Sequence, residues 1–281
     1  MPDDRIGNNW ETENNNIRSA AMKWCRYQNG NTASFGIIEG EDVIEIVGDP
    51  FGEYTRGSQS QPLSSVKLLP PVIPSTFYAA GINYREHIIE MAAKRGEEPQ
   101  FPPNADVGYR ANNALTGQDD PIVVPKDATE LLQYEGELVV VFGKKCRNVS
   151  EAEALEYVFG YTIGNDVSER TWQRGDRTMW RAKNTDTFKP MGPWIVTDLE
   201  PDDFHVTINL NGRLVGEYDV KDAIFSVRHY ISKMSQYLTI YPGDVLWMGT
   251  DGAPENMKHG DIVEVGINDI GVLRNPVIWE K

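Results

Sequence analysis

The chain of 281 residues is 40% hydrophobic, 10% aromatic and 25% charged, a composition that can bury a sizeable core and excludes global disorder. Its formal net charge of −15 argues against nucleic acid and anionic membrane surfaces as partners. No stretch approaches the roughly 18 apolar residues of a membrane-spanning helix, and the first residues lack the basic and apolar parts of a secretory signal. Cys25 and Cys146 lie far apart without a metal-binding spacing, which favours free thiols in a reduced cytoplasm.

The N-terminal part of the chain predicts an extension followed by a small domain. Residues 1–21 are polar and rich in asparagine, so we expect a flexible extension there. Residues 22–70 contain short alternating runs separated by turns such as "NG" and "EGED", which predict a small β-rich domain. The proline-rich stretch 61–75 predicts a connection to the main domain at 72–281.

A helix is expected where the main domain begins. Asn83 can cap it together with Glu86 three residues on, and Gly96 can end it. Residues 97–121 are rich in Pro, Asn, Gly and Asp, which predicts a long, irregular and mobile loop.

The remainder of the chain is mainly β. Residues 138–142, "LVVVF", predict a strand buried on both faces. The capping pair Ser150 and Glu153 predicts a helix that closes near Gly160. Beyond Pro190 the chain alternates around an "NG" turn and then shows strands entered through Gly-Asp turns. The predicted class is therefore α+β and strand-dominated.

Three carboxylates recur close to the buried strand. Glu135 and Glu137 lie on the same side of an extended chain, about 7 Å apart. A buried carboxylate needs a partner, and a divalent cation such as Mg²⁺ is one solution. The alternative is an ordinary amphipathic strand with charge at alternate positions. Asp166 is either a third ligand or a helix cap completed by Glu169.

Two further features carry potential chemistry. His87 and Glu90 are three residues apart on the predicted helix and therefore share a face, as a base and the carboxylate that orients it or as a surface pair. Six cations crowd the segment 170–189 of an acidic protein, which points either to an anionic substrate or to pairing with the surplus acids. These cations are Arg170, Arg174, Arg177, Arg181, Lys183 and Lys189.

The order of the motifs resembles the fumarylacetoacetate hydrolase family over residues 72–281. The motifs are "AAGINYREHIIE", "YEGELVVVFGKK", "GYTIGNDVSERTWQ", "RAKNTDTFKPMGPWIV", "INLNGRLV" and "YPGDVLWMGT". Residues 22–70 are similar to the small domain that precedes it in bacterial members, such as acylpyruvases and 2-hydroxyhepta-2,4-diene-1,7-dioate isomerase-like proteins. The resemblance implies a mixed β-sandwich roll with a short lid helix, commonly assembled as a homodimer.

The resemblance also implies the members of the site. It assigns the divalent metal, Mg²⁺ or Mn²⁺, to Glu135, Glu137 and Asp166. It assigns catalysis to the water-activating or proton-moving pair His87 and Glu90 and to Lys183. It assigns substrate contacts to Tyr84, Arg110, Gln173 and Thr250.

The lysine motif of the family, G-K-S-x-D, reads "AKNTD" at residues 182–186 of this chain, and the chain departs from the family pattern at two further places. The loop after the lid lacks the family's P-x-x-F-x-K, for which Tyr109 and Arg110 are the candidate replacements. The family's G-T-P-x-G reads "GTDGA" at residues 249–253. Both changes fall where the distal end of the substrate is expected.

The implied activity is hydrolysis of a C–C bond in an acylpyruvate-type (2,4-diketo acid) substrate through a metal-bound pyruvate enolate, for example in aromatic-compound catabolism. The alternatives on the same site are decarboxylation of oxaloacetate-like acids, isomerisation or hydration of 2-hydroxydienoates, and a binding protein without turnover. The expected partner is a small keto acid.

Overall fold

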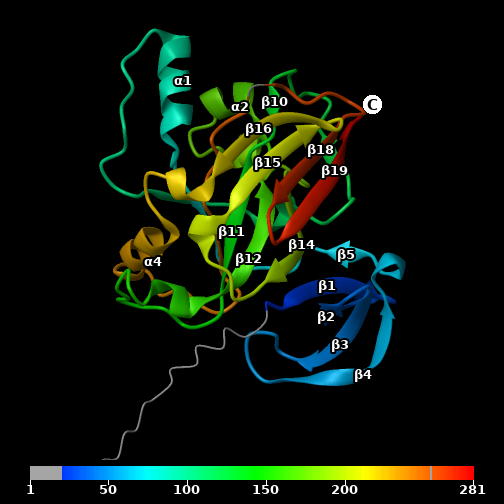
Figure 1. Ribbon diagram of the computed structural model, residues 1–281. Helices are drawn as coiled ribbons and strands as arrows, with labels where there is room; N and C mark the ends of the chain where they lie inside the picture. Colours follow the sequence, from blue (N-terminus) through cyan, green and yellow to red (C-terminus); the bar gives the residue numbers. More distant parts are fainter. Residues whose placement is uncertain (1–20, 254) are drawn as a thin grey trace, which may run out of the picture.

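A computed structural model describes residues 21–253 and 255–281, so the extension expected at 1–21 lies almost entirely outside the described residues. Three sheets form most of the fold (Figure 1). The large sheet has twelve strands; in spatial order ten of them are β4 (Tyr54–Pro62), β3 (Asp42–Gly48), β2 (Thr32–Glu39), β1 (Lys23–Asn29), β14 (Lys189–Val196), β12 (Val158–Asn165), β11 (Gly136–Phe142), β17 (Val245–Trp247), β6 (Phe77–Ala80) and β7 (Val107–Tyr109). The other two are β5 (Leu68–Leu69), which pairs with β1, and β8 (Leu115–Thr116), which pairs with β14.

A second sheet lies against the large one (Figure 1). Its strands are, in order, β16 (Arg213–Asp219), β15 (His205–Leu210), β18 (Ile262–Ile267), β19 (Gly271–Trp279) and β9 (Ile122–Val124). A small third sheet pairs β10 (Leu132–Gln133) with β13 (Ser168–Glu169). Most pairings are antiparallel, and β17 with β6 is one of the parallel ones. The strand-dominated α+β class with mixed sheets is confirmed.

Strand β11 lies at the centre and is buried on both faces, as its apolar run predicts. Leu138 and Val140 pack into the core shared with Ile208 of the second sheet. Val139 and Val141 point the other way, into a separate cluster around Trp247. Side chains on both faces of β11 therefore pack into hydrophobic clusters and hold in place the strand that carries Glu137.

The N-terminal strands β1–β4 form a lobe at one end of the molecule (Figure 1). Consecutive strands pair as antiparallel hairpins, in agreement with the turn signals in the sequence. Lys23 and Trp24 of β1 also pair with Val196 and Ile195 of β14, so the lobe continues the large sheet. Cys25 and Cys146 are buried free cysteines.

The described helices are short: α1 (Arg85–Arg95), α2 (Arg170–Gly175), α3 (Trp180–Asn184) and α4 (Val227–Ser235). Gly96 ends α1 in the left-handed conformation at φ 69°, as predicted. The prediction that Asn83 caps α1 is wrong. The N-cap is Tyr84, and Asn83 is buried because its side chain bonds the backbone of Phe225 and Met248 instead.

Two other local predictions are corrected. The segment 97–121 is not irregular throughout, since β7 pairs with β6 and β8 pairs with β14. The helix predicted after Ser150 is a single 3₁₀ turn, Ala154–Tyr157. Ser150 donates its hydroxyl to Glu153 at 2.6 Å, but the chain then enters β12, whose pairing with β11 and β14 outweighs helix extension.

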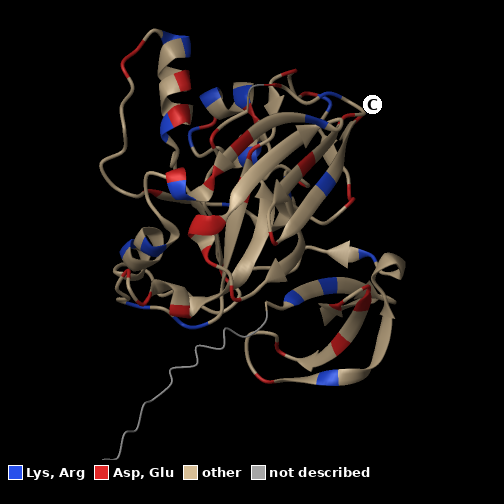
Figure 2. Cartoon of the chain, viewed as in Figure 1, with Lys and Arg blue, Asp and Glu red and all other residues tan. Residues whose placement is uncertain are grey.

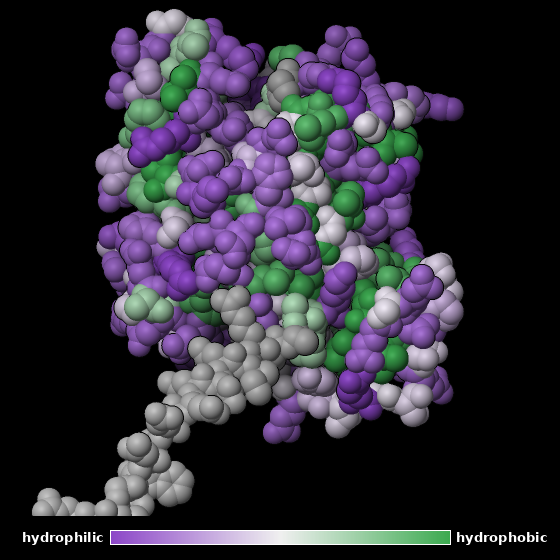
Figure 3. All heavy atoms as spheres, viewed as in Figure 1, coloured by the Kyte–Doolittle hydropathy of each residue, from purple (hydrophilic) through white to green (hydrophobic). Residues whose placement is uncertain are grey.

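Charged residues of both signs occur along α1 and on strands of both β layers (Figure 2). Hydrophilic side chains predominate on the face shown in Figure 3, with apolar side chains between them. Among the described residues, no helix combines the length and apolar character needed to cross a bilayer.

Candidate metal centre

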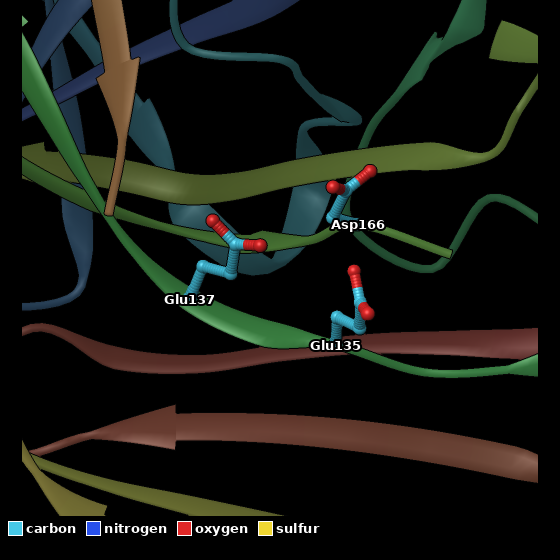
Figure 4. Close-up of side chains that lie close together, drawn as sticks. All are labelled: Glu135, Glu137 and Asp166. Atoms are coloured by element: carbon cyan, nitrogen blue, oxygen red, sulfur yellow. The ribbon is translucent and has the colours of Figure 1, made fainter. Parts of the chain in front are cut away.

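Three carboxylates meet where β11 begins and β12 ends. Glu135 immediately precedes β11, Glu137 lies within it, and Asp166 immediately follows β12. The two strands are antiparallel with Gly136 opposite Asn165, so the pairing register itself brings the three residues together. One oxygen from each carboxylate lies within 4.8 Å of the others, and Figure 4 shows the three side chains side by side. Their exposures are only 6%, 3% and 2%.

Two buried lysines contact this cluster. Lys183 of α3 places Nζ 2.5 Å from Glu135 Oε2 and 2.7 Å from Asp166 Oδ2. Lys189, the first residue of β14, places Nζ 2.6 Å from Asp166 Oδ1 and also donates to the Val167 carbonyl. A single ammonium thus bridges two of the three carboxylates, which fixes their separation.

Two arginines complete the charge balance. Arg170 donates to Glu135 Oε1 at 2.6 Å, and Arg110 donates to Asp166 Oδ2 at 2.8 Å. The capping role considered for Asp166 is therefore not what the structure has. The N-cap of α2 is Glu169, whose carboxylate accepts the Trp172 N–H at 2.5 Å.

The acids differ sharply in their electrostatic surroundings. Burial, together with the charges of Asp166 and Glu135, raises the pKa of Glu137 to about 8. Burial would also raise the pKa of Glu135, but Arg170 and Lys183 outweigh it and lower that pKa to about 2.

Asp166 and Lys189 form a tightly buried pair. Burial opposes the charge of Asp166, but Arg110, Lys183 and Lys189 together hold the pKa of Asp166 well below its usual range. Burial lowers the pKa of Lys189 to about 7, although Asp166 acts against this shift. Asp166 and Glu135 are therefore the ionised members of the cluster at neutral pH.

The residues present fit a hard divalent cation. In the part of the chain that the structure describes, Glu137 has no ion pair, and its Oε2 accepts the Gly249 N–H at 2.8 Å. Positive charge beside Glu137 would favour its ionised form. Carboxylate oxygens from three buried side chains are the donors that Mg²⁺ and Mn²⁺ prefer.

Helix α1 brings His87 near the cluster but leaves Glu90 outside. His87 is half-buried, and burial lowers its pKa, while the charge of Glu135 opposes this shift. Glu90 is 60% exposed and lies 3.6 Å from Lys94 Nζ. Among the hydrogen bonds of the described residues, none joins His87 to Glu90.

The turn after β17 packs directly on His87. A Cβ atom at Gly252 would lie 2.6 Å from His87 Nδ1, and the φ of Gly252 is 115°, so this position requires glycine. The backbone of His87 also interacts with the Asp251 carboxylate, whose pKa burial raises to about 6. The aspartate that replaces the family's proline therefore faces the first turn of the lid helix.

The four residues expected to contact the substrate differ in their own contacts and in their burial. Arg110 contacts Asp166 directly and borders a cavity of about 600 Å³. Gln173 accepts from Arg170 at 2.8 Å. Tyr84 and Thr250 are buried, with exposures of 2% and 6%.

Sequence reasoning missed the individual contribution of Lys189 and that of Tyr218, whose hydroxyl donates to the carbonyl of Gly136, the residue before Glu137, at 2.7 Å. In the sequence Lys189 is one of six cations between residues 170 and 189, and its neighbours Phe188 and Pro190 do not indicate that its ammonium group is fully buried. Tyr218 lies in the β15–β16 hairpin, far along the chain from the carboxylates. The inward position of an aromatic side chain on β16 was the available signal.

Family models match both the N-terminal strands and the rest of the chain. The family model described as fumarylacetoacetate (FAA) hydrolase C-terminal matches residues 76–278, and the model described as Rv2993c-like, N-terminal matches residues 22–71. The chain is 36% identical to 2,4-didehydro-3-deoxy-L-rhamnonate hydrolase from Sphingomonas sp. (strain SKA58), over 91% of this chain and 96% of that protein. It is 35% identical to oxaloacetate tautomerase YisK from Bacillus subtilis (strain 168), over 79% and 76%.

A solved structure is also similar to this chain in fold and sequence. The crystal structure of 5-carboxymethyl-2-hydroxymuconate delta-isomerase from Mycobacterium smegmatis matches with a TM-score of 0.83 and 35% identity, over 92% of this chain and all of that chain (100%). Hydrolases, isomerases and tautomerases thus share this fold and this level of similarity. The chain belongs to the fumarylacetoacetate hydrolase family.

Proposed function

We propose that the protein is a divalent-metal-dependent hydrolase that cleaves a C–C bond in an acylpyruvate-type substrate and releases pyruvate. The observation that carries this proposal is the buried triad of carboxylates, two of which share the Lys183 ammonium. The similarity to a hydrolase over nearly the whole chain supports it.

Glu135, Glu137 and Asp166 would hold Mg²⁺ or Mn²⁺. When bound, the metal supplies a Lewis acid for the 2-oxo group of the keto acid. Lys183 places a positive charge beside the same carboxylates, where it stabilises negative charge that develops on the substrate oxygen. Arg110 and Arg170 add the positive charge that an anionic acid requires.

His87 would act as the general base. Burial keeps its pKa low, so the imidazole is neutral at pH 7 and can accept a proton from water. The resulting hydroxide adds to the distal carbonyl carbon of the substrate. The C–C bond to the pyruvate unit then breaks, and its electron pair forms the pyruvate enolate. The proton held by His87 passes to the methylene carbon of that enolate, which gives pyruvate and a carboxylic acid.

Glu90 would orient His87 only after a local change. Its carboxylate is 60% exposed and faces Lys94. Among the described residues no hydrogen bond joins Glu90 to His87, and this favours a second candidate, an isomerase or tautomerase of 2-hydroxydienoates or oxaloacetate, because proton transfer between two substrate atoms needs no activated water. The 35% identity to an oxaloacetate tautomerase supports the second candidate. Decarboxylation of oxaloacetate-like acids uses the same enolate.

A paired assay with Mg²⁺ separates these candidates. Pyruvate release is followed from an acylpyruvate and from oxaloacetate, and enol–keto conversion of oxaloacetate is followed in the ultraviolet. We expect acylpyruvate cleavage, reduced by about 100-fold or more in His87→Ala and unchanged in His229→Ala, a control histidine on α4 that pairs with Glu151. Turnover of oxaloacetate alone would move the assignment to a decarboxylase or tautomerase.

We also propose that the protein is cytoplasmic and homodimeric, with residues 22–70 and 72–281 as separate domains. The family resemblance supports the dimer, and the family-model matches at 22–71 and 76–278 support the division. Light scattering after size-exclusion chromatography tests the dimer, and a mass near that of one chain would contradict it.

A further inference from the structure

The backbone of Gly249 lies between Glu137 and a tyrosine from the second sheet. Its N–H donates to Glu137 Oε2 at 2.8 Å, and its carbonyl lies 3.3 Å from the Tyr218 hydroxyl. Gly249 has a φ of 84°, a left-handed backbone conformation that favours glycine. The orientation of Glu137 therefore depends on what holds this peptide.

The same hydroxyl also holds the other side of Glu137. Tyr218 Oη donates to the carbonyl of Gly136 at 2.7 Å, which is the residue directly before Glu137. A hydroxyl has one proton, so the shorter contact carries the hydrogen bond and the Gly249 carbonyl is the secondary acceptor. Tyr218 thus joins the strand that carries Glu137 to the turn that binds its carboxylate.

Tyr218 also contacts the base of the lid helix. Its ring packs edge-on against Tyr84 with ring centroids 4.7 Å apart, and Tyr84 is the N-cap of α1, which carries His87. Both tyrosines are buried, at 8% and 2% exposure. Tyr218 therefore links the strand that carries Glu137 to helix α1. A phenylalanine at this position would keep the ring contact with Tyr84 but lose the hydrogen bond of the hydroxyl to Gly136.

We propose that Tyr218 is a positioning residue that fixes the Glu137 carboxylate in its metal-binding orientation. It does so through the peptides of Gly136 and Gly249, since among the described residues no hydrogen bond joins its hydroxyl to the three carboxylates. The proposal rests on the metal centre of the proposed function. It predicts that the hydroxyl matters for metal affinity more than for folding.

The experiment compares Tyr218→Phe with the wild type by Mn²⁺ binding, measured from the electron paramagnetic resonance signal of free Mn²⁺. We expect the Mn²⁺ dissociation constant to rise about tenfold, in the range seen when groups that orient metal ligands are removed. The matched control is Tyr27→Phe, which removes the hydroxyl of a fully buried tyrosine on β1, in the N-terminal lobe. We expect this control to bind Mn²⁺ as the wild type does.

Amide exchange in metal-free protein gives a second measurement that does not depend on Mn²⁺. In Tyr218→Phe the Gly249 amide should exchange about tenfold faster, because the loss of the hydrogen bond to Gly136 loosens Glu137, whose carboxylate accepts the Gly249 N–H. The Met248 amide, which donates to Leu138 at 3.0 Å, is the internal control and should not change.

The outcomes are distinguishable. Unchanged Mn²⁺ affinity in Tyr218→Phe, with a wild type that binds Mn²⁺, overturns the role of Tyr218 and leaves the metal centre intact. A wild type that binds no Mn²⁺ overturns the metal centre and the proposal with it. Weaker binding in Tyr218→Phe with unchanged binding in Tyr27→Phe supports both.

Discussion

Glu135 and Glu137 are two positions apart at the start of β11, yet their surroundings predict opposite effects on stability when each is replaced by glutamine. Glu135 faces two cations, Arg170 at 2.6 Å and Lys183 at 2.5 Å. Glu137 faces a peptide N–H and the charges of the other two acids. In metal-free protein at pH 7, Glu135→Gln should destabilise the fold and Glu137→Gln should stabilise it.

The magnitudes follow from the pKa shifts. The pKa of Glu135 is lowered from 4.5 to about 2. Its contribution to stability is therefore present above pH 4.5 and lost as the pH falls through about 2. Each pKa unit corresponds to about 1.4 kcal/mol, so Glu135→Gln should lower the free energy of unfolding by about 3 kcal/mol. Breaking one side of a buried ion pair typically costs about 3–5 kcal/mol, which agrees.

The sign is reversed for Glu137. Its pKa is raised from 4.5 to about 8, so its favourable contribution is present below pH 4.5 and lost as the pH rises through about 8. At pH 7 the unfolded chain gains by releasing the proton, which costs the fold about 3 kcal/mol. A neutral glutamine removes that cost, so Glu137→Gln should raise the free energy of unfolding by up to about 3 kcal/mol.

Urea unfolding at pH 7 with a chelator, followed by tryptophan fluorescence, measures both changes. Glu98→Gln, at an exposed position, is the control and should stay within about 0.5 kcal/mol of the wild type. Added Mn²⁺ should then stabilise the wild type and have no effect on Glu137→Gln. Shifts of the same sign for Glu135→Gln and Glu137→Gln would refute the electrostatic reasoning.

Three other predictions concern a base, two thiols and a packed glycine. Because burial lowers the pKa of His87, activity should stay level from pH 8 to 7 and decline only below about pH 6.5, the ordinary histidine value; a pH–rate profile that declines already above pH 7 would contradict this. Burial raises the pKa of Cys25 to about 12 and also raises that of Cys146, so a thiol reagent should react with neither until urea unfolds the protein. Gly164→Ala would place Cβ within 2.6 Å of the buried Trp247 ring, and urea unfolding should show a loss of about 1–3 kcal/mol.

The sequence by itself determined the class, the central strand and the three acids. The run 138–142 has no polar residue, so only a strand buried on both faces suits it, and β11 has this burial. Glu135 and Glu137 adjoin that run, and the order of the motifs selected the family. These signals are local or depend on order along the chain, which is why they can be read without a structure.

Local helix signals were less reliable where tertiary contacts compete. Asn83 has the side chain of a cap, but the buried carbonyl of Met248 and the backbone of Phe225 offer it partners. Ser150 and Glu153 bond each other as a capping pair would, yet the chain enters β12 because two neighbouring strands pair with it. In both cases long-range hydrogen bonds replaced the local ones.

Only the tertiary structure decided which charges meet. Six cations lie between residues 170 and 189, but spacing could not distinguish Lys183 and Lys189, which contact Asp166, from Arg181, which pairs with Asp176. The hydroxyl of Tyr218 reaches the peptide of Gly136 from 82 positions away. Such contacts depend on how two sheets pack face to face, and the local pattern of a sequence does not contain that geometry.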